Sequence, residues 1–423
     1  MIDSGTTGFM IVSAMLVVLM TPGLAFFYGG LSRRKNVVNT MFMVLAVMGV
    51  VGITWFVAGW SIAYGGSGQS PFIGGFDQLF LADWGMFSEV SGNPEGGTGY
   101  PRMVDFSFQI AFAFITAGIL TGALAGRMKF SALLVFLAVW NLGIYAPLAH
   151  MVWGGEGSFI GDVIGALDFA GGDVVHIASG VSGLVLCLMV GRRRDFGIMP
   201  YRAHNVPFVL LGTALLWFGW FGFNAGSAFA ADGVAALALA TTIIAPAFAM
   251  ASWMVTERLR TGKCTVVGAC TGILSGLVVI TPAAGFVEPW AAAVMGVIVA
   301  PICYFCISGL KAKLGYDDAL DAFGAHGVGG MVGGVLTGIF CVPELSWTEY
   351  GGLIYTGDAH LLGAQVLGIL VTLVFVAAGT AFIGLVLKAA CKGRLAVDAR
   401  AQSQGLDVTL HGEAAYPSFD GLD

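Results

Sequence analysis

The sequence predicts an all-α membrane protein that crosses the bilayer eleven times. Of its 423 residues, 57% are hydrophobic and only 10% are charged, whereas soluble domains carry about 25% charged residues. Apolar runs of the ~20 residues that a spanning helix needs recur along the whole chain. The 64 glycines fit a bundle of closely packed membrane helices, because small residues let helix backbones approach one another.

Eleven apolar runs are candidates for spanning helices. They cover residues 8–31, 39–64, 104–125, 130–152, 172–191, 206–228, 234–257, 264–282, 289–310, 323–342 and 361–391. The weakest candidates are 206–228, which contains several glycines, and 264–282, which is short. Basic residues follow the run 8–31 but none precedes it, which is the reverse of a signal peptide. We therefore expect residues 8–31 to be retained as the first span.

The loop charges orient the bundle. Basic residues cluster at 33–35, 127–129, 192–202, 258–263, 311–313 and 388–400, in every second loop and in the tail. Of the 19 Lys and Arg residues, only Arg102 falls on the other side. The positive-inside rule then places the N-terminus outside and the C-terminus in the cytoplasm, which agrees with an odd number of spans.

The two longest polar segments lie outside these spans. The outer loop at about 65–103 is rich in Gly, Ser, Asn and Pro, and we expect no regular structure there. Residues 1–391 form the predicted membrane domain, and 392–423 form a cytoplasmic regulatory tail. Within that tail, Gly405–Val408 and His411–Glu413 are expected to be ordered only by contact with another surface. A disordered tail is the alternative.

An internal repeat relates the two halves of the chain. The pattern His176-x-x-x-Gly180-x-x-Gly183 recurs 150 residues later as His326-x-x-x-Gly330-x-x-Gly333. The two copies fall in the fifth and tenth predicted spans, so equivalent helices run in opposite directions. This arrangement indicates inverted repeats at about 8–191 and 206–342, with 361–391 as an additional eleventh helix and the functional site near the midplane. A weaker match pairs Phe27–Gly30 with Phe223–Gly226.

The repeated histidines point to a functional site. An ionisable side chain within a spanning helix is costly and usually has a role, although a core histidine with satisfied hydrogen bonds is the structural alternative. On a helix, Gly180 and Gly183 lie on nearly the same side as His176, so they let the two helices approach and bring the imidazoles together. One neutral imidazole can then donate to the other, because each has one donor and one acceptor nitrogen.

The residues around the histidines favour a small neutral solute with hydrogen-bonding capacity. No Asp or Glu lies near the middle of a predicted span to coordinate sodium. Asp168 and Asp173 lie at the outer start of the fifth span, where a helix N-terminus favours a carboxylate, and we expect Asp173 to be an N-cap. An intramembrane hydrolase is disfavoured, since no nucleophile is placed symmetrically with both histidines.

Other functional classes find little support. Cys303 and Cys306 form a C-x-x-C pair within an apolar run, but there is no second pair, so we interpret them as packing residues. The chain carries a net charge of −6 and lacks the basic patches of nucleic-acid-binding proteins. The sequence indicates no metal, no cofactor and no enzymatic activity.

Seven motifs, in the same order along the chain, resemble the ammonium transporter family (Amt/MEP/Rh) and specifically its bacterial and archaeal Amt branch. They are Thr21–Gly30 with Arg33–Asn36, Ala149–Gly155, Ala166–Gly172 with Val174–His176, Trp220–Ser227, Thr281–Gly285, Asp321–Gly327 and Gly405–Asp407. The resemblance covers nearly the whole chain. It implies a homotrimer of eleven-helix protomers in the cell membrane, each with its own pore.

The resemblance also implies roles for individual residues. The matching positions are Phe108, Trp153 and Ser227 for an outer recruitment site, Phe112 and Phe223 for a stacked gate, His176 and His326 for the pore, Asp168 for support of the recruitment site, and Trp220 and Thr281 for the pore side. One departure is Gly126, which stands where many relatives carry an acidic residue. A second is the tail, which continues past Tyr416.

The function implied is transport of ammonium, with methylammonium as an analogue. Ammonium would be recruited outside, lose a proton near the gate, pass the histidines as ammonia, and regain a proton inside. Separate proton transfer would make the transport electrogenic. A PII-type signalling protein is the regulatory partner that the resemblance implies at the cytoplasmic face. An ammonium sensor with secondary transport, or a channel for another small neutral solute, is the alternative.

Overall fold

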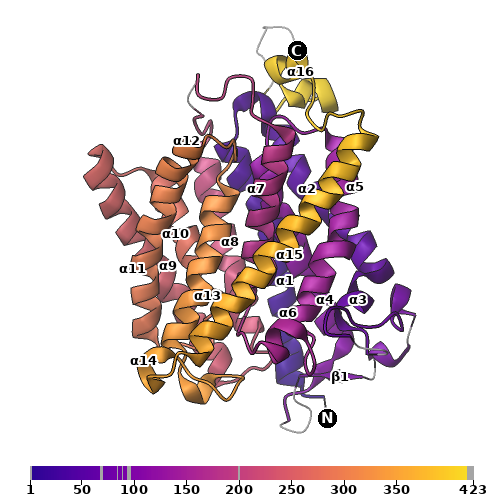
Figure 1. The fold of residues 1–423 in the computed structure, drawn as a ribbon, viewed down its shortest axis with the longest axis vertical. Coiled ribbons are helices and arrows are strands. Elements are labelled where there is room, and N and C mark those ends of the chain that lie inside the picture. The colour runs from indigo at the N-terminus through magenta and orange to yellow at the C-terminus, as the bar shows by residue number, and fades with distance from the viewer. Residues whose placement is uncertain are drawn as a thin grey trace.

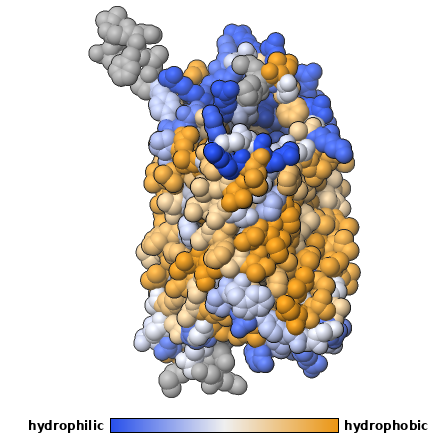
Figure 2. Space-filling model, turned by 90° about the vertical axis from the view of Figure 1, so that its left-hand side faces the viewer, coloured by the Kyte–Doolittle hydropathy of each residue, from blue (hydrophilic) through white to orange (hydrophobic). Residues whose placement is uncertain are grey.

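The computed structural model describes residues 2–66, 70–82, 84–87, 89–92, 97–198 and 201–416. Long helices run side by side along the longest axis of the molecule, with the N-terminus at one end and the C-terminus at the other (Figure 1). Hydrophobic side chains form a broad belt around the middle of the face in Figure 2, and hydrophilic side chains gather at the two ends. The predicted all-α membrane fold is confirmed.

The bounds of the helices and strands are as follows. The α-helices are α1 (Ser4–Leu31), α2 (Val37–Thr54), α3 (Trp60–Tyr64), α4 (Arg102–Thr121), α5 (Phe130–Trp140), α6 (Ala146–Trp153), α7 (Ala178–Val190), α8 (Val206–Gly226), α9 (Gly233–Thr261), α10 (Val266–Ile280), α11 (Pro289–Phe305), α12 (Lys311–Leu314), α13 (Val328–Phe340), α14 (Leu353–Thr356), α15 (His360–Ala390) and α16 (Ala399–Gln404). The strands are β1 (Val90–Ser91) and β2 (Tyr100–Pro101). Single π-helical turns join several helices into longer stretches, as at 55–59, 141–145 and 306–310.

In the part of the chain that the structure describes, ten helical stretches are long and apolar enough to cross a membrane. They coincide with ten of the predicted spans. The remaining candidate, 264–282, corresponds to α10, which has only 15 residues and is followed by turns. The count of eleven therefore stays a prediction, although termini at opposite ends agree with an odd number of crossings (Figure 1).

Helices α1 and α8 pack against each other along much of their length. The weaker repeat match, Phe27–Gly30 with Phe223–Gly226, lies on these two helices. A Cβ atom on Gly30 would lie 2.6 Å from the backbone nitrogen of Val209, and one on Gly212 would lie 2.3 Å from that of Phe27. Neither distance is sterically allowed. Glycine is therefore required on both helices for the close approach, which is how the predicted interface between the halves is built.

The outer loop is more regular than the sequence suggested. Strand β1 pairs with β2 in antiparallel register, Val90 opposite Pro101 and Ser91 opposite Tyr100. Arg102, the one basic residue on this side, donates to Glu89 at 2.5 Å and to the Tyr64 carbonyl at 2.9 Å. The expectation of no regular structure across 65–103 was wrong here, because strands of two residues are too short to show an alternating pattern.

The C-terminal tail folds against its own chain. Asp407 Oδ1 accepts the backbone N–H of Asn39 at 2.8 Å, and Asn36 Oδ1 accepts that of Leu406 at 2.9 Å. Lys35 Nζ donates to two carbonyls of α16 at 2.8 and 2.7 Å. The other surface that orders Gly405–Glu413 is thus the N-terminal end of α2. Residues 417–423 of the predicted tail lie outside the described residues.

Gly126 allows a sharp turn shortly after the C-terminal end of α4. Its φ of +79° is in the left-handed region that favours glycine. The turn buries Arg127, which forms an ion pair with Asp317 and donates to the Gly191 carbonyl at 2.9 Å. Burial alone would raise the pKa of Asp317, but the charges of Arg127 and Arg193 lower it below its ordinary value.

Candidate functional site

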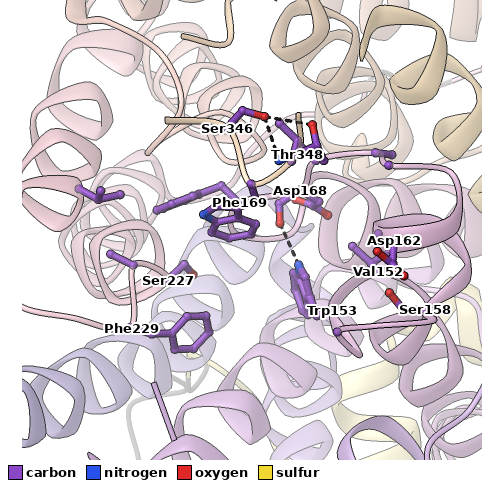
Figure 3. Close-up of a pocket in the computed structure, with 18 of the residues that line it drawn as sticks. Val152, Trp153, Ser158, Asp162, Asp168, Phe169, Ser227, Phe229, Ser346 and Thr348 are labelled. Atoms are coloured by element: carbon purple, nitrogen blue, oxygen red, sulfur yellow. Dashed lines mark hydrogen bonds between the residues drawn. The ribbon is translucent and has the colours of Figure 1, made fainter. Parts of the chain in front are cut away.

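A large cavity opens at the end of the molecule opposite the tail. Its volume is about 1300 Å³, and its wall includes Phe112, Trp153, Asp168, Ser227 and Phe229. Figure 3 shows Trp153, Asp168, Ser227 and Phe229 arranged around this space, with a hydrogen bond joining Trp153 to Asp168. We call this cavity the outer vestibule, after the side of the membrane on which the loop charges predict it to lie. It brings together most of the residues predicted for recruitment.

Trp153 and Ser227 lie at helix ends in this wall. Trp153 ends α6, and its indole Nε1 donates to the Asp168 carbonyl at 2.8 Å, which fixes the ring. Ser227 follows α8, and its hydroxyl donates to the Phe223 carbonyl at 2.8 Å. The hydroxyl hydrogen is thereby used, so the oxygen lone pairs remain free to accept a donor from the vestibule.

Phe108 lies behind the wall rather than in it. The side chain is fully buried, with its ring centroid 4.8 Å from that of Phe112 and 5.9 Å from that of Phe229. A Cβ on Gly226 would lie 2.8 Å from the Phe108 ring, so this glycine makes room for it. Of the three residues predicted for recruitment, Trp153 and Ser227 line the vestibule directly and Phe108 supports its inner edge.

Two stacked phenylalanines close the inner end of the vestibule. The rings of Phe112 on α4 and Phe223 on α8 are 4.0 Å apart and inclined by only 10°. Both side chains are almost completely buried. Phe223 is also 6.2 Å from His176, measured between ring centroids. The pair therefore separates the vestibule from the histidines, in the place predicted for a gate.

The two histidines meet behind this gate. His176 Nδ1 lies 3.3 Å from His326 Nδ1, and both side chains are buried. Each sits in a π-helical turn, η8 (Gly172–Ile177) before α7 and η10 (Phe323–Gly327) before α13. Such turns are rare and are frequent at functional sites. His176 Nε2 has no hydrogen-bond partner among the described residues.

Glycines make the approach of the two helices possible. A Cβ on Gly180 would lie 2.4 Å from the backbone nitrogen of Gly327, and one on Gly330 would lie 2.8 Å from the Gly172 carbonyl oxygen. The role predicted for Gly180 is confirmed, and Gly330, its equivalent in the repeat, has the same role. Gly183 differs, because its Cβ would face Ala123 at 3.1 Å. Gly183 allows close packing against the end of α4 and contributes less to the contact between the helices that carry His176 and His326.

Trp220 and Thr281 form a support for His176. The Trp220 ring stacks on the imidazole with centroids 5.3 Å apart and planes inclined by 23°. Its indole Nε1 donates to Thr281 Oγ1 at 2.9 Å, and the Thr281 hydroxyl donates to the Leu277 carbonyl at 2.8 Å. This chain of hydrogen bonds fixes the Trp220 ring that stacks on His176.

Asp168 holds the segment that carries His176. Its two carboxylate oxygens accept the backbone N–H groups of residues 171–174, at 2.7, 2.6, 2.8 and 3.3 Å. Burial raises the pKa of Asp168, and the four N–H groups act in the opposite direction. Gly171 turns the chain with a φ of +118°. The expectation that Asp173 is the N-cap was wrong, because Asp168 already satisfies these N–H groups; the Asp173 Oδ1 atom has no partner among the described residues.

Sequence reasoning missed the counterpart of Asp168 in the second repeat. Asp318 accepts the N–H groups of Ala322 and Phe323, at 3.1 and 2.8 Å, just before the turn that carries His326. Asp168 and Asp318 each precede their histidine by eight residues. Asp321 corresponds in the same way to Gly171, since both residues have a positive φ, of 63° and 118°. The equal spacing was a signal from which the aspartate could have been found.

These features together define a class of protein. Within the described residues, no group of three His, Cys, Asp or Glu side chains is placed to hold a metal ion. The site is a wide vestibule, an aromatic gate and a buried hydrogen-bonding pair, enclosed by membrane-spanning helices. It is suited to passing a small solute across a bilayer.

Comparison with known proteins gives the family. The profile of the Ammonium Transporter Family matches residues 8–416, and the chain belongs to this family. It is 46% identical to an ammonium transporter of Aquifex aeolicus over 98% of this chain and 94% of the relative. It is 44% identical to one of Bacillus subtilis over 97% and 98% of the two chains.

Solved structures agree. Saccharomyces cerevisiae Mep2 superimposes with a TM-score of 0.84 at 34% identity, covering 94% of this chain and 88% of that one. A protein described as "Sensor Amt Protein" superimposes with a TM-score of 0.87 at 29% identity, covering 96% and 98%. The predicted resemblance is confirmed, and the chain is a multi-pass membrane protein of a transporter family.

Proposed function

We propose that this protein recruits ammonium in the outer vestibule, removes one proton, and conducts ammonia past His176 and His326. The observation that supports this most strongly is the closed Phe112–Phe223 stack above a buried pair of imidazoles. No fixed anion lies beside the histidines among the described groups that contact them. An intact cation would have to enter this region without compensation.

Recruitment uses the chemistry of the vestibule wall. The face of Trp153 attracts a cation through its ring quadrupole. The Ser227 oxygen, whose hydrogen is donated to Phe223, accepts one N–H bond. Ammonium offers both a positive charge and N–H donors. The recruitment site therefore recognises it in two ways, although charge alone would not distinguish it from potassium.

Selectivity follows from the loss of the proton. Moving an ion from water into an apolar passage costs many times the thermal energy, unless polar groups in the passage replace the water molecules that the ion loses. Ammonium can leave its proton behind and continue as neutral ammonia, whereas potassium has no neutral form. The imidazole nitrogens of His176 and His326 supply hydrogen-bonding partners for ammonia along the passage. The proton crosses separately, which makes the transport electrogenic.

The test replaces both histidines in proteoliposomes. His176→Ala together with His326→Ala removes the hydrogen-bonding pair and leaves space for water. We expect loss of ammonium selectivity, seen as ammonium currents that fall or as potassium currents that appear. His360→Ala, which removes an exposed imidazole in the vestibule wall away from the gate, is the matched control. Unchanged ammonium current with intact potassium exclusion in the double variant would show that the pair is not the selective element.

Assembly and regulation are further parts of the proposal. We infer a homotrimer in the cell membrane, with a PII-type signalling protein binding the cytoplasmic face beside the docked tail. The ordered residues 399–411 and the neighbouring basic cluster at 33–35 provide a surface for such a partner. Failure of any PII-type protein to co-purify at low nitrogen would count against this partner. Sensing as the main role is not favoured, since the relatives at 46% and 44% identity are named transporters.

A further inference from the structure

A group of buried oxygen atoms in the outer vestibule has no role in the function proposed above. Asp105 Oδ1, Gln109 Oε1 and the Tyr64 hydroxyl are all buried and have no hydrogen-bond partner among the described residues. The same three residues line the vestibule. Gln109 is only 5% exposed, so its amide is held almost entirely within the wall of this cavity. We call Asp105, Gln109 and Tyr64 the outer acceptor cluster.

The cluster lies on the approach to the gate. Asp105, Gln109 and Phe112 are spaced i, i+4 and i+7 along α4, so they share one face of this helix. At a rise of 1.5 Å per residue, Asp105 lies about 10 Å from Phe112 along the helix, toward its N-terminal end. A solute that moves inward along α4 therefore passes Asp105 first, then Gln109, and then reaches the stacked rings.

Arg102 interacts with the charge of Asp105 but does not pair with it directly. Asp105 Oδ2 accepts only the Ser91 hydroxyl, at 3.2 Å, among the described residues. Arg102 lies one turn away, but its guanidinium donates to Glu89 and to the Tyr64 carbonyl, and it forms no hydrogen bond with Asp105. Glu89, Arg102 and Asp105 together carry a charge of −1. The carboxylate is thus left with one unshared, buried oxygen beside the vestibule.

Buried oxygen acceptors without a partner are stabilised when a hydrogen-bond donor or a cation binds to them. Burial of an oxygen acceptor without a partner is unfavourable, and most such atoms in proteins are found with a hydrogen bond. A carboxylate, an amide oxygen and a phenol oxygen together make an all-oxygen site with a single negative charge. This set suits a small monovalent cation, whereas divalent ions usually recruit more carboxylates. Tyr64 and Tyr100 also lie close enough to Asp105 to interact with its charge.

We propose that the outer acceptor cluster is a second cation site, which binds ammonium about 10 Å before the gate and supplies it to Trp153 and Ser227. The proposal rests on the transport function above and adds a site that comes earlier in the path. Because its ligands are all oxygen atoms, the site does not discriminate between ammonium and potassium. Potassium therefore competes for it, even though potassium is not conducted.

The test compares two substitutions in the vestibule, each of which removes one negative charge. Asp105→Asn removes the charge of the cluster, and Glu349→Gln removes an exposed charge elsewhere in the vestibule wall. We measure ammonium-evoked current in proteoliposomes against ammonium concentration, with and without excess external potassium. Asp105→Asn should raise the half-saturating ammonium concentration about five- to tenfold, as expected for the loss of a charge-assisted contact, and should abolish competition by potassium. Glu349→Gln should change the half-saturating concentration less than twofold and keep the competition.

A smaller change in the cluster separates loss of the site from loss of folding. Tyr64→Phe removes only the hydroxyl, and it should shift the half-saturating concentration in the same direction by about twofold, as expected for one neutral hydrogen bond. Crystals of the unchanged protein soaked in thallium(I) should show anomalous density between Asp105 and Gln109. The proposal would be overturned if the density between Asp105 and Gln109 were that of a water molecule only. It would also be overturned if Asp105→Asn and Glu349→Gln had the same half-saturating ammonium concentration and the same competition by potassium. Loss of current in the unchanged protein would instead contradict the transport function itself.

Discussion

The carboxylate of Asp168 positions the first histidine through the backbone of the segment that carries it. Asp168 satisfies four consecutive backbone N–H groups at the start of the turn that holds His176. The family motif indicated its importance, but the motif could not show that the support works through the backbone. Asp173 was the expected cap because it is nearer to the helix. The backbone at Gly171 instead folds the chain back, so that Asp168 reaches these groups.

The first prediction concerns this carboxylate. Asp168→Asn keeps one acceptor oxygen but turns an NH2 group toward backbone N–H donors. We expect a loss of about 2–3 kcal/mol of stability, as for hydrogen bonds to a charged group, together with strongly reduced ammonium current. Thermal unfolding in detergent and current in proteoliposomes measure the two effects. Asp162→Asn, which alters an exposed carboxylate that accepts the Gly157 N–H, should leave both nearly unchanged. Equal effects of the two variants would contradict a special role for Asp168.

At the scale of helices, hydrophobic runs were enough to place most elements. Residues 130–152 were predicted and the structure has 130–153; 206–228 became 206–226. The span 264–282 was placed correctly but ends at Ile280, since Pro282 follows and the chain turns there. The π-helical turns at His176 and His326 could not be predicted, because nothing in an apolar run distinguishes one helical hydrogen-bonding pattern from another.

The second prediction concerns the contact between the two histidine helices. Gly180→Ala places a methyl group 2.4 Å from the backbone nitrogen of Gly327, so the helices must separate. We expect a loss of about 1–3 kcal/mol or more from overpacking and a large fall in ammonium current, because the imidazoles lose their contact. Gly49→Ala is the matched control: it lies within α2 with nothing within 4 Å of the added carbon. That change should stabilise the protein by about 0.5–1 kcal/mol. Normal current in Gly180→Ala would show that the close approach is not needed.

At the scale of the whole molecule, the predicted inverted repeat accounts for the position of the site. Histidines, aspartates and left-handed residues of the two halves correspond in order, and the paired turns meet in the interior. The repeat was visible in the sequence only through its rarest residues, since glycine and apolar matches carry little information in this composition. The outer acceptor cluster has no such signal. It depends on the C-terminal end of α3 lying beside the start of α4, which no local pattern encodes.

The last prediction concerns the direction of the molecule in the membrane. The hydrophobic belt fixes the depth of the bundle but not its direction, which rests on the loop charges alone (Figure 2). Cys264 is exposed beside the basic cluster at 258–263, at the end predicted to be cytoplasmic. With Cys306→Ser and Cys391→Ser, it becomes the accessible thiol for a membrane-impermeant maleimide.

Intact cells should leave Cys264 unlabelled, and permeabilised cells should label it. A second variant provides the opposite result: Glu344→Cys together with Cys264→Ser, Cys306→Ser and Cys391→Ser should react in intact cells, because residue 344 lies in a predicted outer loop. If the two patterns were exchanged, the vestibule would open to the cytoplasm. Recruitment at Trp153 and Ser227 would then serve export, and the docked tail would face the outside, where no PII-type protein is present.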